Sequence, residues 1–372
     1  MTIDEEWLQS PDRFRKVGSR HHVVPKFVLK KWADSSGRVW VKSKHDRREG
    51  IRMITDLGIK DFYTFIATDG KLDSSLEHLL SGVEARAAAV LRKLGTPFAI
   101  DVAVTFQEFT ELVEFVAFQA VRSPRRRREH EMMVDWQAKT VAALTMADTV
   151  TEDELRTLEF TPHQNEHIEQ IGPLAEAVAR DLLERPVCLI TLDRPMLLIG
   201  DEMVIMITTG GPISHLPECA MTEQEWQREF KRSSKKKGRR RRPVTRTAHV
   251  VSTQRRGIST AVEIAMPISP RTVLLFGPKG GDDWGGVVER DQFAGAEAEE
   301  LAARINHHIV EDSLDIVVGR LDDDEFRALP IPERRPLLTV CGSSGAAKEA
   351  LMAVPRRLRP SRMDRHAEQV KP

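Results

Sequence analysis

The chain has 372 residues, 41% apolar and 30% charged, and its 56 basic residues balance its 56 acidic ones. This length predicts one large domain or two ordinary ones with a packed core. The three cysteines lie far apart and form no CxxC pair, which argues against a disulfide framework and a cysteine-based zinc site. The acidic start "MTIDEEWLQSPDRF" lacks the apolar core of a secretory signal, and no window approaches the roughly 18 apolar residues of a membrane span. We therefore expect a soluble, cytoplasmic protein with no membrane contact.

Charge is strongly segregated along the chain. Arg125 to Arg128 form "RRRR", and the segment from Arg228 to Arg246 carries eleven Lys or Arg against a single Glu. Such runs are typical of solvated, mobile segments. The basic loop, placed at residues 228–247, could bind nucleic acid electrostatically, but it has no interleaved aromatic residues for stacking on single strands. A solvated loop is the favoured interpretation.

The first half of the chain predicts helices. A short one begins at Pro25, which suits the first helical position. The clearest helix covers residues 74–95, where apolar residues keep one face for about five turns. The next begins with a Thr105–Glu108 capping box and ends before Pro124. Three more are expected, from Trp136 to Asp148, after a Thr151–Glu154 capping box, and from Thr161 through Leu183.

After Pro186 short apolar runs bounded by Pro, Gly and Asp predict strands. These runs are "VCLITL", "MLLIGD", "MVIMIT", "AVEIAMPIS", "TVLLFGP" and "LDIVVGR", with a helix from about Ala296 to Val310 before the last. The predicted fold class is α+β, with a helical N-terminal half (residues 20–185) packed on a strand-rich C-terminal half (186–345). Residues 1–19 are expected to be a disordered lead-in and 346–372 a basic disordered tail.

Two polar pairs near predicted helix ends are candidates for chemistry. His21 and His22 precede a helix start, where backbone N–H groups favour an anion, although two solvated histidines are the simpler interpretation. Gln119 and Arg122 lie near the end of a helix that is apolar nearly all round. A guanidinium beside a core needs an anionic partner, so Arg122 closes a structural ion pair or points into a polar cleft.

Three carboxylates are further candidates. Glu77 and Glu84 are seven residues apart and share one side of their helix, where carboxylates can serve acid–base work or hold a metal. A Ser74–Glu77 capping box would explain Glu77 without further function. Asp201 follows a predicted strand, a common place for catalytic carboxylates and for ordinary turns.

The chain also resembles a bacterial family, the domain of unknown function 4238. The resemblance starts with "HHVVPKFVLKKW" and continues in order through "GRVWVKSK", "DFYTF", "LEHLLSGVEARAAAVL", "FVAFQAVRSP", "LLIGDEMV", "MPISPRTVLLF" and "RINHHIV". It departs from the family pattern at Val23 and Lys26, and it lacks the hydroxyls and proline of a "TSDxP" segment around Asp201. The family has no established activity, but the resemblance implies one polar set: His21, His22, Tyr63, Glu77, Glu84, Gln119, Arg122, Asp201 and Asn306.

This set predicts a hydrolase, a phosphoesterase resembling nucleases, in which water is activated by a carboxylate or histidine and a divalent metal ion could take part. The expected catalytic residues are His21, His22, Tyr63, Glu77, Glu84 and Asp201. Gln119, Arg122 and Asn306 would bind the substrate. The alternative hypotheses are a non-catalytic protein that binds a phosphate-bearing ligand or nucleic acid through Arg122 and the basic loop, and a polar network that only fixes the packing.

Overall fold

The computed structural model describes most of the chain. The ranges are residues 20–60, 62–67, 72–95, 102–146, 149–160, 162–163, 165–207, 249–252, 257–279, 287–333 and 337–341. The predicted lead-in (1–19), the basic loop (228–247) and the tail (346–372) lie outside them. No helix in these ranges is both long and apolar enough to cross a membrane.

The helices gather in the N-terminal half, as predicted. In chain order they are α2 (Lys26–Leu29), the 3₁₀ turn η1 (Ile54–Leu57), α3 (Ser75–Leu94), α4 (Phe106–Val121), α5 (Pro124–Thr145), α6 (Glu152–Thr157), α7 (Glu166–Leu183), η2 (Ile258–Thr260), α10 (Gly295–Asp312) and α11 (Asp324–Ala328). The capping boxes expected at Thr105–Glu108 and Thr151–Glu154 are both present.

The two longest described strands, β12 and β14, lie in the C-terminal half. In chain order the strands are β1 (Arg20–His21), β2 (Arg38–Ser43), β3 (Glu49–Met53), β4 (Ile59–Lys60), β5 (Phe65–Ile66), β6 (Leu72–Asp73), β7 (Val102–Ala103), β8 (Val187–Leu192), β9 (Ile199–Gly200), β10 (Ile205–Ile207), β11 (His249–Ser252), β12 (Glu263–Ser269), β13 (Thr272–Phe276), β14 (Val287–Phe293), β15 (Ile316–Gly319) and β16 (Leu338–Cys341). The fold class is therefore α+β, as expected.

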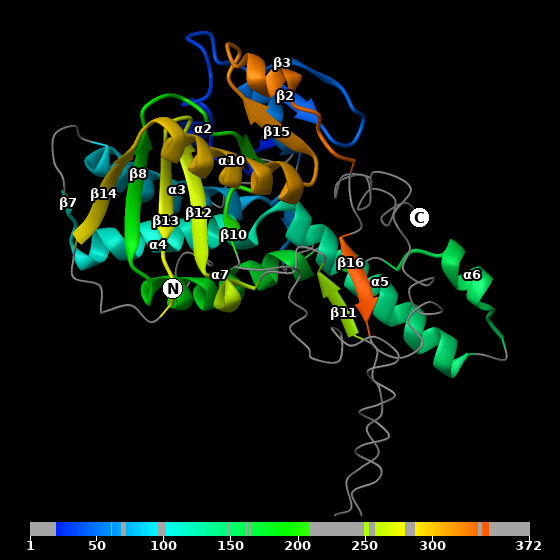
Figure 1. The fold of residues 1–372 in the computed structure, drawn as a ribbon. Helices are drawn as coiled ribbons and strands as arrows, with labels where there is room; N and C mark the ends of the chain where they lie inside the picture. Colours follow the sequence, from blue (N-terminus) through cyan, green and yellow to red (C-terminus); the bar gives the residue numbers. More distant parts are fainter. Residues whose placement is uncertain are drawn as a thin grey trace, which may run out of the picture.

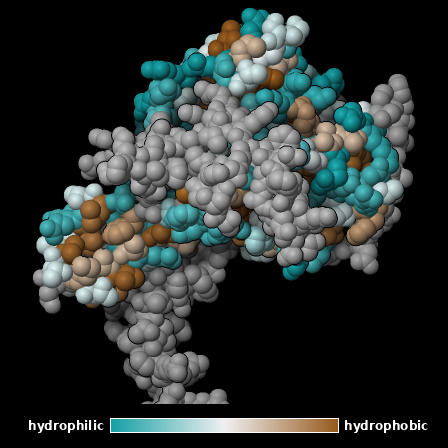
Figure 2. All heavy atoms as spheres, turned by 180° about the vertical axis from the view of Figure 1, so that it is seen from behind, coloured by the Kyte–Doolittle hydropathy of each residue, from teal (hydrophilic) through white to brown (hydrophobic). Residues whose placement is uncertain are grey.

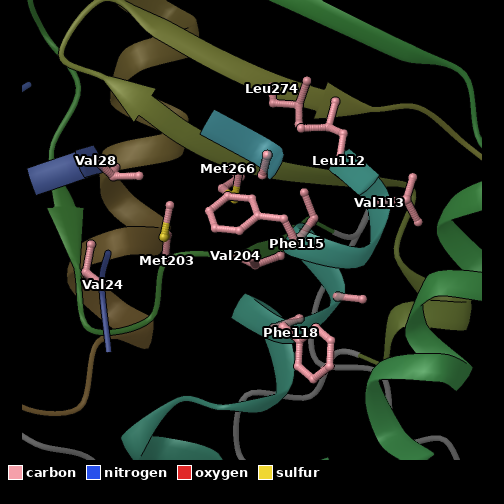
Figure 3. Packing of buried hydrophobic residues seen from close by; sticks show 14 of the residues in the cluster. Val24, Val28, Leu112, Val113, Phe115, Phe118, Met203, Val204, Met266 and Leu274 are labelled. Atoms are coloured by element: carbon pink, nitrogen blue, oxygen red, sulfur yellow. The ribbon is translucent and has the colours of Figure 1, made fainter. Parts of the chain in front are cut away.

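A six-stranded sheet of order β10-β12-β13-β8-β14-β7 forms the centre of the molecule. Helices α3, α4 and α7 cover one face and α10 covers the other (Figure 1). Strand β8 shows the alternation that this requires, since Val187 and Leu189 join the core beneath α4 while Ile190 and Leu192 pack under α10. Figure 3 shows Phe115 of α4 packed among Met203, Val204 and Met266 in the first of these cores.

A second, four-stranded antiparallel sheet of order β3-β2-β15-β9 joins the two ends of the described fold. The hairpin β2–β3 from the N-terminal part pairs with β15 from the C-terminal part, with Trp40 opposite Gly319. This sheet therefore ties the N-terminal hairpin to the C-terminal part, whereas the segment that carries His21 is held by the pairing of β1 with β4.

Helix α5 corrects two expectations. It begins at Pro124, twelve residues before the predicted Trp136, so the "RRRR" run is helical and not a solvated loop. Arg125 and Arg127 pair with Glu129 and Glu131 one turn later, and Arg125 is buried. Such pairs four residues apart stabilise a helix that its charge run alone would not predict. The outer part of the arm formed by α5 and α6 exposes apolar side chains (Figure 2): Val141, Leu144, Met146 and Leu158.

Candidate functional site

Arg122, which ends α4, is the centre of a buried polar cluster. Its side chain is 1% exposed, and Nη2 donates to Glu84 Oε1 on α3 at 2.7 Å and to the Val23 carbonyl at 3.2 Å. A buried guanidinium stays charged, so this carboxylate is required for its burial. Glu84 is therefore the anionic partner that the sequence predicted for Arg122.

Tyr63 and His21 form the wall beside Arg122. The guanidinium carbon of Arg122 lies 5.8 Å from the centre of the Tyr63 ring, close enough for a cation–π contact. The His21 ring stacks on the Tyr63 ring, with the ring centres 5.5 Å apart and the ring planes 11° from parallel. His21 Nδ1 also accepts the backbone N–H of Tyr63 at 2.8 Å. Both side chains are fully buried, and burial raises the pKa of the Tyr63 phenol well above its usual value.

Glu77 departs from its predicted capping role. The Ser74 side chain makes no cap hydrogen bond, since the Glu77 N–H donates to the Ser74 carbonyl at 3.0 Å. One residue earlier, Asp73 Oδ1 accepts the Ser75 N–H at 2.7 Å. The Glu77 carboxyl is half-buried, and burial raises its pKa to about 7, against the lowering effect of Arg122. It is thus a carboxyl that changes charge near neutral pH.

We call His21, Tyr63, Glu77, Glu84, Gln119 and Arg122 the Arg122 cluster. Three of its polar atoms, Tyr63 Oη, Gln119 Nε2 and Arg122 Nε, are buried without a hydrogen-bond partner among the described residues. Glu77 and Glu84 are only partly buried, and the exposed Lys26 lies close enough for its charge to lower the pKa of Glu77. The cluster therefore runs from solvent, through two carboxyls, to buried donors.

Three predicted site residues make their contacts elsewhere. His22 donates from Nε2 to the Ile54 carbonyl at 3.0 Å. Asp201 accepts from the backbone N–H groups of residues 314–316, and Asn306 bridges the Met196 carbonyl and the Leu198 N–H. The contacts of Asp201 and Asn306 hold loops against β9 and α10. Asn306 also lines a separate cavity of about 930 Å³.

The anion site expected at the helix start beside the histidines is not formed as predicted. Helix α2 is only four residues long, with Pro25 at its N-cap position. Its few aligned peptide groups make a much weaker dipole than a full helix would. Any anion near His21 would have to be bound by side chains, above all by Arg122.

A second buried carboxyl, Glu202, was missed by the sequence analysis. Its Oε1 accepts the Arg125 N–H at 3.3 Å in the first turn of α5, and burial followed by the neighbouring Asp201 raises its pKa to about 8. The signal that could have found it is a pair of adjacent acids at a strand end, in "GDEMV". Its partners belong to the start of α5 and not to the Arg122 cluster.

Within the ranges given above, no group of three or more His, Cys, Asp and Glu side chains is arranged to hold a metal ion. The divalent metal ion considered from the sequence thus gains no support from these residues. The Arg122 cluster contains two carboxyls, and the remaining side chains that face them are mainly hydrogen-bond donors.

Comparison with known proteins adds one finding. The model of a family described as "Protein of unknown function (DUF4238)" matches residues 20–323. No curated protein and no solved structure matches the chain. The match covers every residue of the Arg122 cluster.

Proposed function

The chain belongs to the DUF4238 family, whose description names no activity, and we propose from the Arg122 cluster that it is a hydrolase of phosphoesters. In this proposal Glu77 is the general acid–base residue and Arg122 binds the substrate anion. Glu84 holds Arg122 in place, and His21 positions Tyr63. The wide separation of the three cysteines supports a cytoplasmic location.

The observation that carries the proposal is the incomplete pairing of Arg122. Its guanidinium is buried, yet Nη2 alone binds a carboxylate and Nε has no partner among the described residues. Gln119 and Tyr63 each add a buried unpaired donor nearby. A network with only a structural role would be expected to satisfy such donors, because each unpaired one costs about 1–3 kcal/mol.

The donors suit a phosphoryl group. A guanidinium presents planar N–H groups that match phosphate oxygens, and amide and phenol groups add single hydrogen bonds. Near pH 7 both forms of Glu77 are populated, so it can take a proton from water or give one to the leaving oxygen. Water would form the new P–O bond while the bond to the leaving oxygen breaks and that oxygen is protonated.

The test compares wild type with Glu77→Gln and Glu111→Gln on p-nitrophenyl phosphate, bis-p-nitrophenyl phosphate and single-stranded oligonucleotides, with and without divalent ions. Glu111 is a matched half-buried glutamate that lies on α4 outside the cluster and pairs with Arg86. We expect Glu77→Gln to lower kcat about 100-fold or more and Glu111→Gln to leave it unchanged.

Equal turnover by wild type and Glu77→Gln would show that Glu77 is not the general acid–base residue. Binding of phosphate or an oligonucleotide without turnover, lost on Arg122→Met, would favour the non-catalytic alternative. In that case the contribution of the basic loop would be measured by deleting residues 228–246.

A further inference from the structure

Helices α3, α4 and α7 enclose a groove that the Arg122 cluster does not use. It has a volume of about 730 Å³, and residues 65–67 at β5 also line it. Its walls are mainly apolar and include Leu79, Val83, Phe118, Ile168, Ile171 and Ala179. Volume and lining both fall in the range of small-molecule sites.

The groove and the Arg122 cluster occupy different faces of α3. Leu76, Leu79 and Val83 line the groove, whereas Glu77 and Glu84 share another side of the helix. None of the six cluster residues lines the groove. A ligand bound in the groove would therefore be held independently of the proposed hydrolase site.

Helix α7 leaves space where it borders the groove. Gly172 and Pro173 stand in its middle and both line the groove. A Cβ added at Gly172 would meet no atom within 4 Å. Pro173 has no N–H to donate to the Glu169 carbonyl four residues earlier. The Glu169 carbonyl therefore lacks its usual helical donor. The two poorest helix formers thus coincide with the wall of the groove.

The charged side chains that line the groove are all acidic. They are Glu114, Glu169 and Glu176, and no Lys, Arg or His stands among the lining residues in the part of the chain that the structure describes. Glu114 pairs with Arg86 and Glu176 with Arg180. The exposed Glu169 makes no ion pair with any described residue, so its charge is available at the mouth of the groove.

We propose that the groove between α3, α4 and α7 binds an amphiphilic organic cation, with the apolar body between the helices and the ammonium group at Glu169. The apolar walls match a hydrocarbon body and the acidic lining matches a positive head. The volume of about 730 Å³ lies within the range of about 300–1,000 Å³ that is typical of small-molecule pockets, which favours a small ligand over a second protein as the occupant.

Binding is measured calorimetrically on the full chain with dodecylamine, dodecanol and dodecanoate. The amine and the acid are kept below the concentration at which they form micelles, and the alcohol below its solubility. We expect saturable binding in the order amine, alcohol, acid. Glu169→Gln should weaken amine binding about two- to five-fold, the range of an exposed ion pair, and leave alcohol binding unchanged.

Two glycine variants locate the site. Gly172→Leu places a side chain in the open space of the groove and should weaken binding of the amine at least about ten-fold. Gly82→Leu is the matched control, because Gly82 is also helical, does not line the groove, and an added Cβ meets only Arg86 Nη1 at 3.7 Å. Thermal unfolding checks that both variants fold.

Three results would overturn the proposal. They are alcohol or acid binding as tight as amine binding, amine binding by folded Gly172→Leu equal to wild type, and absence of saturable amine binding by wild type. A dimer that Gly172→Leu abolishes would instead assign the groove to a second copy of the chain. Because Glu77 lies outside the groove, Glu77→Gln should not alter amine binding, whether or not the hydrolase proposal holds.

Discussion

Replacing Glu77 by glutamine should make the protein more stable, increasingly so as the pH rises. Burial gives this carboxyl a pKa of about 7 in the folded chain, against 4.5 for an unperturbed glutamate. A carboxyl with a raised pKa binds its proton more tightly when folded, so its contribution to stability is complete below pH 4.5 and falls as the pH rises to about 7. At about 1.4 kcal/mol per pH unit, the loss above pH 7 is about 3 kcal/mol.

The assay is chemical denaturation of wild type and Glu77→Gln from pH 4 to pH 9. We expect nearly equal free energies of unfolding at the lowest pH and a gain for the variant that grows to about 3 kcal/mol above pH 7. Glu111→Gln, on the surface of α4, should differ from wild type by less than about 0.5 kcal/mol. A difference between Glu77→Gln and wild type that is constant over this range would refute the burial argument. A loss of stability above pH 7 would refute it as well.

Four further substitutions test other parts of the structure by the same denaturation assay. The free energy of unfolding of Glu202→Gln should rise relative to that of wild type between about pH 4.5 and about pH 8, because burial raises the pKa of this carboxyl to about 8. A rise confined to acidic pH would contradict this. Asp201→Ala should lower the free energy of unfolding by about 3 kcal/mol, since three backbone N–H groups lose their acceptor, and a neutral result would show that water replaces it. Gly200→Ala should destabilise the protein by about 1–3 kcal/mol or more, because the added Cβ would lie 1.9 Å from Ser313 Oγ. Gly172→Ala should instead stabilise the protein by about 0.5–1 kcal/mol. Equal effects of the two substitutions would reject the packing described at β9.

Local patterns predicted the elements whose stability comes from a single apolar face. The stripe along α3 and the apolar runs of β8, β12 and β13 fall close to their predicted positions, because period 3.6 and period 2 follow directly from backbone geometry. The predicted start of helix α5 was twelve residues too late. Its first turns are stabilised by opposite charges four residues apart and not by an apolar stripe, so a search for apolar periodicity passes over them.

The candidate site was predictable in its residue types but not in its grouping. Arg122 was expected to have an anionic partner, yet nothing local distinguishes Glu84, 38 residues away, from other glutamates. The Val23 carbonyl lies 99 residues from Arg122 in sequence, and only the tertiary fold brings the two together. The capping box expected for Glu77 had the right spacing, but the Glu77 N–H donates to the Ser74 carbonyl and the Ser74 side chain makes no cap hydrogen bond.

Glu77 and Glu202 show how two carboxyls with similarly raised pKa values can differ in what they do. Glu202 is 4% exposed and accepts a hydrogen bond from the first turn of α5, so its environment is closed and accounts for its position. Glu77 makes no capping bond, remains partly exposed, and faces a guanidinium that is itself incompletely paired. An acid–base residue must exchange its proton with a substrate, so its carboxyl has to remain accessible and cannot be fully engaged in structural hydrogen bonds. Such a residue can lower the stability of the fold, as the raised pKa of Glu77 implies. This difference in access, more than the pKa itself, places the proposed chemistry at Glu77.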